Sequence, residues 1–224
     1  MTAHRGRSWL FVPGDRPERF DKALHSGADA VIVDLEDAVA PANKARARDA
    51  VADLLDTQPV YVRVNGADTR WHTEDLAALS HRAGLLGVLL PKTTSAADVA
   101  ATAAALGAHV QLVALIETAA GLRNADTIAA AERTTRLAFG SIDFALDIGA
   151  DTDDAALLYA RSTLVLASRV AGLPGPVDGV TTDLDDSAAT TRDAEHARGL
   201  GFAGKLCIHP RQVGPVNTAF GYST

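Results

Sequence analysis

Short apolar runs that end in polar residues recur at nearly even intervals along this chain of 224 residues. Six such runs cover residues 8–12, 30–35, 60–64, 87–90, 112–116 and 136–142. The polar residues at their ends lie about 22 to 29 residues apart, from Gly14 to Glu36 at the shortest and from Glu36 to Asn65 at the longest. One strand, one loop and one helix take that many residues, so the rhythm predicts a serial βα repeat.

Two further apolar runs, at 176–180 and 205–209, complete eight βα units. Strands that are apolar on both faces are typical of a parallel sheet covered by helices. We therefore predict one α/β domain over residues 1–224, a compact (β/α)8 TIM barrel whose C-terminal end is short because about 15 residues follow His209. The active site of such a barrel lies at the carboxyl ends of its strands.

The connecting helices are expected between these strands, at residues 17–25, 42–55, 73–83, 96–106, 122–131, 154–171 and 186–199. On the second of them, Lys44, Arg46 and Arg48 are expected to face the solvent.

Composition narrows the classes of function. A net charge of −7 without blocks of like charge argues against a nucleic-acid or membrane surface. The single cysteine, Cys207, excludes an internal disulfide framework and fits a reducing compartment. The N-terminus has no signal-peptide core, and no apolar run approaches the roughly 18 residues of a membrane span. We therefore expect a cytoplasmic protein.

Two acids follow the fifth and sixth predicted strands, and they are the strongest candidates for a metal site. Glu117 and Asp143 would lie at neighbouring strand ends of the barrel, where two carboxylates can share one divalent cation. Mg²⁺ suits them, because it prefers oxygen ligands and keeps waters that substrate can displace. The alternative is that the two acids cap the following helices or lie on the surface.

Arg63 is the candidate for anion binding. Its neighbours in the strand are valines that face the other way, so Arg63 is expected to point into the barrel mouth. Its anion is either the substrate or Glu36. The run Asp34-Leu35-Glu36-Asp37 ends the second strand, and its acids are expected to hold waters or Arg63, with a helix cap as the alternative for Asp37. We expect an electrostatic or structural role for Lys92.

Two further groups of residues have weaker signals. The early segment with Arg7 and Lys22 is locally basic and either holds phosphates or forms a solvated helix face. On the last strand Cys207 is expected in the core, and His209 is expected to fix the strand end. The chain has no Gly-rich phosphate loop, which argues against a nucleotide hydrolase or a dehydrogenase.

Seven short motifs, read in order, resemble the citrate lyase beta-subunit-like family within the aldolase/citrate lyase superfamily, to which malyl-CoA lyases are related. The motifs span about residues 7 to 217 and are RSWLFVPG from Arg7, DLED from Asp34, VRVN from Val62, LPK from Leu90, ALIET from Ala114, FGSID from Phe139 and CIHP from Cys207. Each motif is weak alone, but the ordered set is specific.

This resemblance implies a Mg²⁺-dependent carbon–carbon lyase that acts on a hydroxyacyl-CoA thioester. It implies that Glu117 and Asp143 bind the metal and that Arg63 and Glu117 contact substrate. The CoA-binding surface of the family includes the N-terminal segment, which points to Arg7 and Lys22. We expect Arg63, Glu36 and Asp37 to take part in catalysis, and citryl, malyl and citramalyl thioesters would all offer the same chelating end.

Three alternatives remain open at this point. The same site fits an acyl-CoA thioesterase or a metal-dependent aldolase of free hydroxy-keto acids, and the chain could also be a non-catalytic subunit of a larger complex. A barrel without a full eighth helix would leave apolar surface uncovered between its first and seventh helices, so we expect a homo-oligomer whose contacts include this edge, and the resemblance implies a trimer. Val213, Val216 and Phe220 would form an apolar stripe at that edge.

Overall fold

Eight parallel strands form a closed barrel in the computed structural model, which describes residues 6–221 apart from the side chain of Ser187. Each strand pairs with its neighbour in sequence, and β8 pairs with β1 to close the ring. The strands are β1 (Ser8–Pro13), β2 (Ala30–Asp34), β3 (Val60–Arg63), β4 (Leu85–Leu90), β5 (Gln111–Ile116), β6 (Thr134–Phe139), β7 (Val177–Asp178) and β8 (Gly204–Cys207). This is the predicted (β/α)8 TIM barrel.

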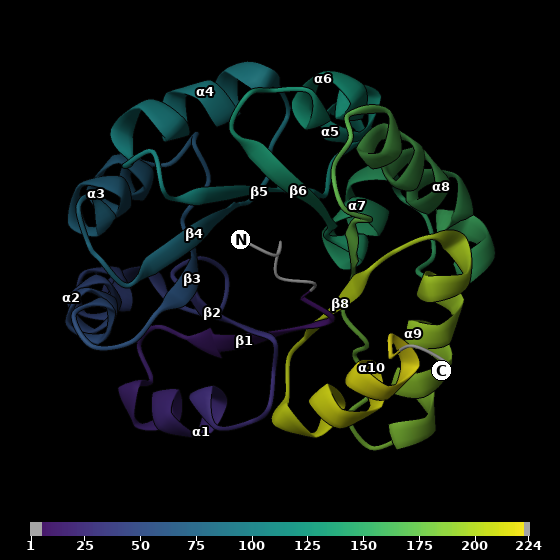
Figure 1. The fold of residues 1–224 in the computed structure, drawn as a ribbon, viewed down its shortest axis with the longest axis horizontal. Coiled ribbons are helices and arrows are strands. Elements are labelled where there is room, and N and C mark those ends of the chain that lie inside the picture. Colours follow the sequence, from purple (N-terminus) through teal and green to yellow (C-terminus); the bar gives the residue numbers. More distant parts are fainter. Residues whose placement is uncertain (1–5, 222–224) are drawn as a thin grey trace.

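Helices form an outer ring around the strands, and Figure 1 shows them following one another around the barrel. They are α1 (Phe20–Leu24), α2 (Lys44–Leu55), α3 (Arg70–Leu79), α4 (Ala96–Ala105), α5 (Ala119–Arg123), α6 (Ala125–Ala129), α7 (Ser141–Ile148), α8 (Asp154–Val170), α9 (Ser187–Leu200) and α10 (Val213–Ala219). Short 3-10 turns at Pro17–Arg19, Pro41–Asn43 and Pro210–Gln212 precede α1, α2 and α10. Within residues 6–221, none of the helices is long and apolar enough to cross a membrane.

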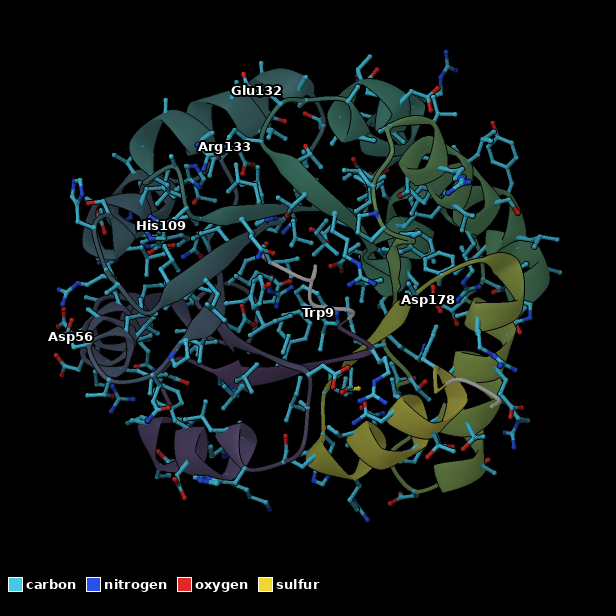
Figure 2. All side chains as sticks on the ribbon, viewed as in Figure 1. Trp9, Asp56, His109, Glu132, Arg133 and Asp178 are labelled. Carbon is cyan, nitrogen blue, oxygen red and sulfur yellow. The ribbon has the colours of Figure 1, made fainter. Side chains whose placement is uncertain are left out.

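Alternation along the strands divides the apolar core into two layers. Side chains such as Trp9, Ile32 and Leu115 fill the barrel interior, and their sequence neighbours pack between the strands and the helices. Successive residues of a strand point to opposite faces, so each strand serves both layers. Figure 2 shows Trp9 near the centre of the ring of strands, whereas Asp56 lies at the periphery beyond α2.

The sixth predicted strand was placed too far along the chain. The run 136–142 was expected to be one strand, but β6 ends at Phe139 and α7 begins at Ser141. The buried residues of α7 are Ser141, Phe144 and Ala145, which is helical spacing. The prediction that Asp143 directly ends a strand is therefore wrong, because Asp143 lies in the first turn of α7.

The apolar stripe expected at the C-terminal edge lies inside the protein. Val213 and Val216 belong to the buried core, and Phe220 packs against it. Helix α10, which carries the two valines, contacts α9 and β1. These side chains therefore leave no exposed apolar patch at this edge, and the expected oligomer needs another surface.

Candidate active site

A small cavity opens at the carboxyl end of the barrel. Its volume is about 80 Å³, and both polar and apolar side chains line it. Arg63, Glu117 and Asp143 lie on its wall, so the fold brings together the three residues that the sequence singled out for metal and anion binding. The other lining residues are Phe11, Leu115, Phe139, Gly140, Ser141, Ile142, Val180 and Leu206.

Glu117 follows β5 and is only 1% exposed. Its Oε1 accepts a hydrogen bond of 2.7 Å from the backbone N–H of Lys92, its one hydrogen bond to the described part of the chain. Thr118 caps α5 by accepting from the N–H of Gly121, so Glu117 is not the cap of that helix. On the other side Gly140 lies so close that a Cβ there would collide with Oε2 and Cβ of Glu117.

The surroundings of Glu117 oppose its negative charge. Burial, together with the negative charges of Glu36 and Asp143, raises the pKa of Glu117 from 4.5 to about 8, although Arg63 and the Lys92 N–H favour the charged form. A cation placed between Glu117 and its acidic neighbours would therefore stabilise the charged form of this carboxyl group.

Asp143 is half-buried in the first turn of α7. Its carboxylate has no hydrogen bond or ion pair with residues 6–221, and it does not cap α7, whose N-cap is Gly140. Its oxygens therefore face the cavity without a protein partner, close enough for their charge to act on Glu117.

This donor set fits Mg²⁺. Glu117 and Asp143 offer carboxylate oxygens free of other protein donors, on the wall of one cavity. The described residues contain no group of three or more His, Cys, Asp or Glu side chains arranged for a metal ion, so the protein would supply two ligands. Mg²⁺ is commonly bound by one or two carboxylates, with waters and substrate filling its other positions.

Arg63 is held chiefly by Asp34 on the neighbouring strand. Nε and Nη2 of Arg63 donate to the two Asp34 oxygens at 2.8 and 2.6 Å, and the two residues are in register between β2 and β3. The third nitrogen, Nη1, lies 3.1 Å from Glu36 and 3.7 Å from Asp37 in ion pairs. The guanidinium also lies over the ring of Phe11, 4.8 Å from its centroid.

Charge pairing sets the ionisation of these groups. Burial opposes the charge of Asp34, but Arg63 and the N–H groups of Glu36 and Ala38 outweigh it and lower the pKa of Asp34. Burial likewise opposes the charge of Arg63, yet the three acids around it raise its pKa. Arg63 and Asp34 are thus a fixed ion pair, and Nη1 is the part of the guanidinium that faces further partners.

Glu36 joins Arg63 to Lys92. Its Oε1 accepts from Lys92 Nζ at 2.6 Å, and Oε2 faces Arg63 Nη1. Burial still raises the pKa of Glu36 in spite of these two cations. Lys92 adopts a left-handed backbone conformation with φ of +49°, which directs its N–H to Glu117 while its side chain reaches Glu36. Lys92 therefore holds both acids.

The sequence reasoning placed Lys44 on the solvent face of its helix, and this is wrong. Lys44 is 6% exposed, and its ammonium donates to the carbonyls of Leu35 and Glu36 at 2.7 Å. It lies 5.3 Å from the ring centroid of Trp71. Lys44 thus fixes the loop that carries Glu36. The one sequence signal for this role is that an acidic segment, which could attract a lysine, precedes the helix.

The two residues predicted to bind CoA lie in different places. Arg7 precedes β1 at the amino-terminal end of the barrel, opposite the cavity, where it forms an ion pair with Asp29 at 2.8 Å. Lys22 is exposed on α1, and with Arg211 it acts on His209 after β8, at the carboxyl end. Burial and these two positive charges lower the pKa of His209. Lys22 therefore lies near His209, whereas Arg7 lies at the other end of β1.

Two expectations for the last strand hold. Cys207 is fully buried in the core, and burial raises the pKa of its thiol to about 12, which makes it a packing residue. His209 accepts from the N–H of Arg211 and caps the turn at Pro210–Gln212, so it does fix the end of β8.

The fold and the cavity define a TIM barrel with two acids and an arginine around one cavity at its carboxyl end. The sequence profile of the HpcH/HpaI aldolase/citrate lyase family matches residues 7–210, and the chain belongs to this family.

Several relatives carry functional names. A (3S)-malyl-CoA thioesterase of Cereibacter sphaeroides is 39% identical over 229 residues, which cover 99% of this chain and 79% of that protein. An L-malyl-CoA/beta-methylmalyl-CoA lyase of the same species is 34% identical over 97% of this chain and 80% of that protein. The crystal structure of CitE from Mycobacterium tuberculosis with magnesium, acetoacetate and coenzyme A matches with a TM-score of 0.86 at 37% identity, over 97% of this chain and 82% of CitE.

Proposed function

We propose that this protein is a Mg²⁺-dependent carbon–carbon lyase that cleaves a 3-hydroxyacyl-CoA thioester of the malyl or citryl type into acetyl-CoA and a keto acid. The observation that carries the proposal is that Glu117, Asp143 and Arg63 line one cavity. Among the described residues, Oε2 of Glu117 and both carboxylate oxygens of Asp143 accept no hydrogen bond. The family and the CitE complex with magnesium and coenzyme A support it.

Glu117 and Asp143 would hold the metal. A bound Mg²⁺ would supply Lewis-acid chemistry there, which would favour loss of the substrate's hydroxyl proton. The Lys92 N–H orients Glu117, and Gly140 leaves room for its second oxygen, so the ligand is aimed before the cation arrives.

Arg63 would bind the oxygen on which negative charge grows. Its bidentate pairing with Asp34 fixes the guanidinium plane and leaves Nη1 as a donor on the cavity side. A donor held in place before the reaction stabilises developing charge without reorganising, which is commonly a large contribution to catalysis.

Asp37 is our candidate for the group that takes the hydroxyl proton. It is more than half exposed and near Arg63 Nη1, whereas both oxygens of Glu36 already face cations. As the hydroxyl loses its proton to Asp37, the bond between the carbinol carbon and the neighbouring α-carbon breaks. Its electron pair passes into the thioester enolate, which takes up a proton to give acetyl-CoA. Glu36 holds Arg63 and Lys92 in position.

The CoA portion would lie across the carboxyl end near Lys22. Lys22 and Arg211 place two positive charges beside His209 there, within an otherwise acidic protein. Phosphate groups are held by such clusters through charge-assisted hydrogen bonds.

Thioester hydrolysis is the second candidate reaction, and one observation favours it. The relative with 39% identity over nearly the whole chain is named a (3S)-malyl-CoA thioesterase. The two reactions share the site and differ in product, because hydrolysis yields free CoA and the intact hydroxy acid.

A single assay distinguishes these reactions. Malyl-, citramalyl- and citryl-CoA are incubated with the protein and Mg²⁺, and products are resolved by mass spectrometry. A lyase gives acetyl-CoA with a keto acid, and a thioesterase gives CoA with the hydroxy acid. If none of the thioesters is consumed with Mg²⁺ present, the proposed function is wrong.

A further inference from the structure

Lys92 has an unusual backbone conformation for a lysine. It lies in the turn after β4, and its φ of +49° is in the left-handed region that favours glycine. Within residues 6–221, His81 is the other residue besides glycine with a positive φ. Such a conformation persists where the surrounding structure holds it, and it is often found at functional sites. The contacts of Lys92 therefore need an explanation of their own.

These contacts join Lys92 to two different acids. Its backbone N–H donates to Glu117 Oε1 at 2.7 Å, and its Nζ donates to Glu36 Oε1 at 2.6 Å. The Lys92 side chain is 44% exposed, so it contributes little to packing and acts mainly through its charge. One residue thus sets the positions of a proposed metal ligand and of a second carboxylate beside it.

Glu36 is that second carboxylate, and its own surroundings suit a cation. It is 5% exposed, and its negative charge contributes more to the raised pKa of Glu117 than that of Asp143 does. Glu36 Oε2 is buried and accepts no hydrogen bond from residues 6–221, although it forms an ion pair with Arg63 Nη1 at 3.1 Å. A buried carboxylate oxygen without a hydrogen bond is well suited to bind a divalent cation.

Two cations pair with Glu36 in this structure. Arg63 is held by Asp34 through two hydrogen bonds, so Lys92 Nζ is the one hydrogen-bond donor to the Glu36 carboxylate within the described part of the chain. With Lys92 in place, residues 6–221 contain no group of three or more His, Cys, Asp or Glu side chains arranged for a metal ion. Glu36 is thus a nearby third carboxylate that stays outside the proposed metal site.

We propose that Lys92 is a positioning residue that withholds Glu36 from the metal ion, so that Glu117 and Asp143 remain its two protein ligands. This inference rests on the metal site of the proposed function. Two carboxylates leave most positions around Mg²⁺ to water and substrate, whereas a third would fill one of those positions. A third carboxylate also favours Ca²⁺, which takes about six to eight oxygen ligands in flexible geometry. Lys92 thus controls both the choice of metal and the access of substrate to it.

Calorimetric titration of the full chain with Mg²⁺ and with Ca²⁺, in the absence of substrate, tests this role. Lys92→Met should bind Ca²⁺ at least about tenfold more tightly and Mg²⁺ at most about threefold more tightly, because loss of Nζ frees Glu36 to bind the metal. A change in local charge alone would strengthen the binding of both metals by a similar factor. Arg198→Met removes an exposed positive charge near the end of α9, and this matched control should change neither affinity.

Pyruvate, a keto acid of the type that the proposed reaction forms, tests the access of substrate to the metal. In the presence of Mg²⁺, Lys92→Met should bind pyruvate at least about tenfold more weakly than the unmodified protein, because Glu36 then fills a position around the metal. In the double variant Lys92→Met/Glu36→Gln the third carboxylate is gone, so pyruvate binding should recover and the gain in Ca²⁺ affinity should disappear. A lysine that simply contacted the keto acid would give no such recovery.

Two further variants separate the side chain of Lys92 from its backbone. Lys92→Gly keeps the N–H to Glu117 and suits the positive φ, so it should shift the metal preference as Lys92→Met does. Lys92→Arg keeps a cation beside Glu36 and should bind both metals as the unmodified protein does.

An unchanged ratio of Ca²⁺ to Mg²⁺ affinity in both Lys92→Met and Lys92→Gly would overturn the proposal. So would a gain in Ca²⁺ affinity, or a loss of pyruvate binding, that persists in the double variant. These results leave the proposed function in place if the unmodified protein consumes the thioesters with Mg²⁺. An unmodified protein that binds no Mg²⁺ would overturn this inference and the proposed metal site together.

Discussion

At the scale of single residues, two buried acids at the carboxyl end of the barrel lie in surroundings that disfavour their charge. Glu117 is 1% exposed and has a pKa of about 8, and Glu36 is also buried with a raised pKa. Buried groups with displaced pKa values gather at functional sites, because the fold keeps them there at a cost in stability. Arg63 and Lys92 offset part of this charge, and a divalent cation would offset the rest.

Replacing Glu117 should therefore stabilise the metal-free protein at high pH. Its folded pKa lies above 4.5, so its favourable contribution is complete below about pH 4.5 and is lost as the pH rises through about 8. At about pH 9 we expect Glu117→Gln to gain on the order of 2 kcal/mol, or roughly 5 °C in Tm. Thermal melts at about pH 6 and pH 9 measure this.

The exposed Glu132→Gln is the control and should show no such gain. Mg²⁺ should raise the Tm of the unmodified protein at the higher pH and leave that of Glu117→Gln unchanged. If the Tm of Glu117→Gln and that of Glu132→Gln changed equally with pH, the burial of the Glu117 carboxylate would not be the cause of the predicted gain.

Asp143 should contribute to metal affinity without contributing to stability. Because its carboxylate has no protein partner among the described residues, Asp143→Asn should keep the Tm within about 2 °C. Calorimetry should show loss of Mg²⁺ binding, and Mg²⁺-dependent activity should disappear. Asp147→Asn on the same helix removes an acid that accepts from the Ala119 N–H, and it should retain Mg²⁺ affinity.

The contribution of Arg63 to activity should depend on the planar shape of its guanidinium as well as on its charge. Lysine keeps the positive charge but cannot pair with both Asp34 oxygens and also present a donor to the cavity. Arg63→Lys should lower kcat/KM at least about tenfold, or about 1.4 kcal/mol of transition-state stabilisation. Steady-state kinetics identical to those of the unmodified protein would make Arg63 a purely structural partner of Asp34.

At the scale of elements, the join between β6 and α7 determines how the two proposed metal ligands, Glu117 and Asp143, approach each other. Gly140 lies between the end of β6 and the first residue of α7, where it is the N-cap. Asp143 therefore reaches the cavity from the first turn of α7. The same glycine lets Glu117 approach from β5, because its missing Cβ is the space that Glu117 occupies. One position thus governs both predicted metal ligands.

Gly140→Ala should displace Glu117 and lower Mg²⁺ affinity at least about tenfold, with a loss of about 1–3 kcal/mol in stability from the clash. Gly199→Ala is the matched control, since a Cβ at Gly199 within α9 meets no atom within 4 Å. That variant should be slightly more stable and bind Mg²⁺ normally. Calorimetry and chemical unfolding of both variants test the prediction.

At the scale of the whole molecule, the two ends of the barrel carry different groups of residues. The carboxyl end holds the cavity and the cluster of Lys22, His209 and Arg211. At the amino-terminal end Arg136 and Trp9 bind the carbonyl of Gly6. Arg7 ties the start of β1 to Asp29 at that end as well.

Variants at the two ends should separate stability from CoA binding. Arg7→Ala should lower the free energy of unfolding by about 0.5–1 kcal/mol and leave KM for the thioester within about twofold, because Arg7 lies opposite the cavity. Lys22→Ala should raise KM at least about threefold, increasingly at low salt, with little change in kcat. A raised KM in Arg7→Ala alone would reverse this assignment.

The order of elements and the face of each side chain follow from local pattern. Spaced apolar runs predicted all eight strands, and alternation placed Arg63 toward the barrel mouth, because the periods of strand and helix are fixed by the backbone. The motifs also singled out Glu117 and Asp143. Only the tertiary structure decided which groups meet. The register of β2 and β3 pairs Arg63 with Asp34 rather than mainly with Glu36.

Three further outcomes depended on packing between distant segments. Lys44 is drawn inward by two carbonyls of the preceding loop, against the solvent face that its helix position indicated. Asp143 reaches the cavity from a helix because Gly140 lets the chain turn there. Arg7 lies at the end of the barrel opposite the cavity because it precedes β1 and pairs there with Asp29. Local pattern determines the element and the face, whereas partner choice depends on distances that exist only once the barrel has closed.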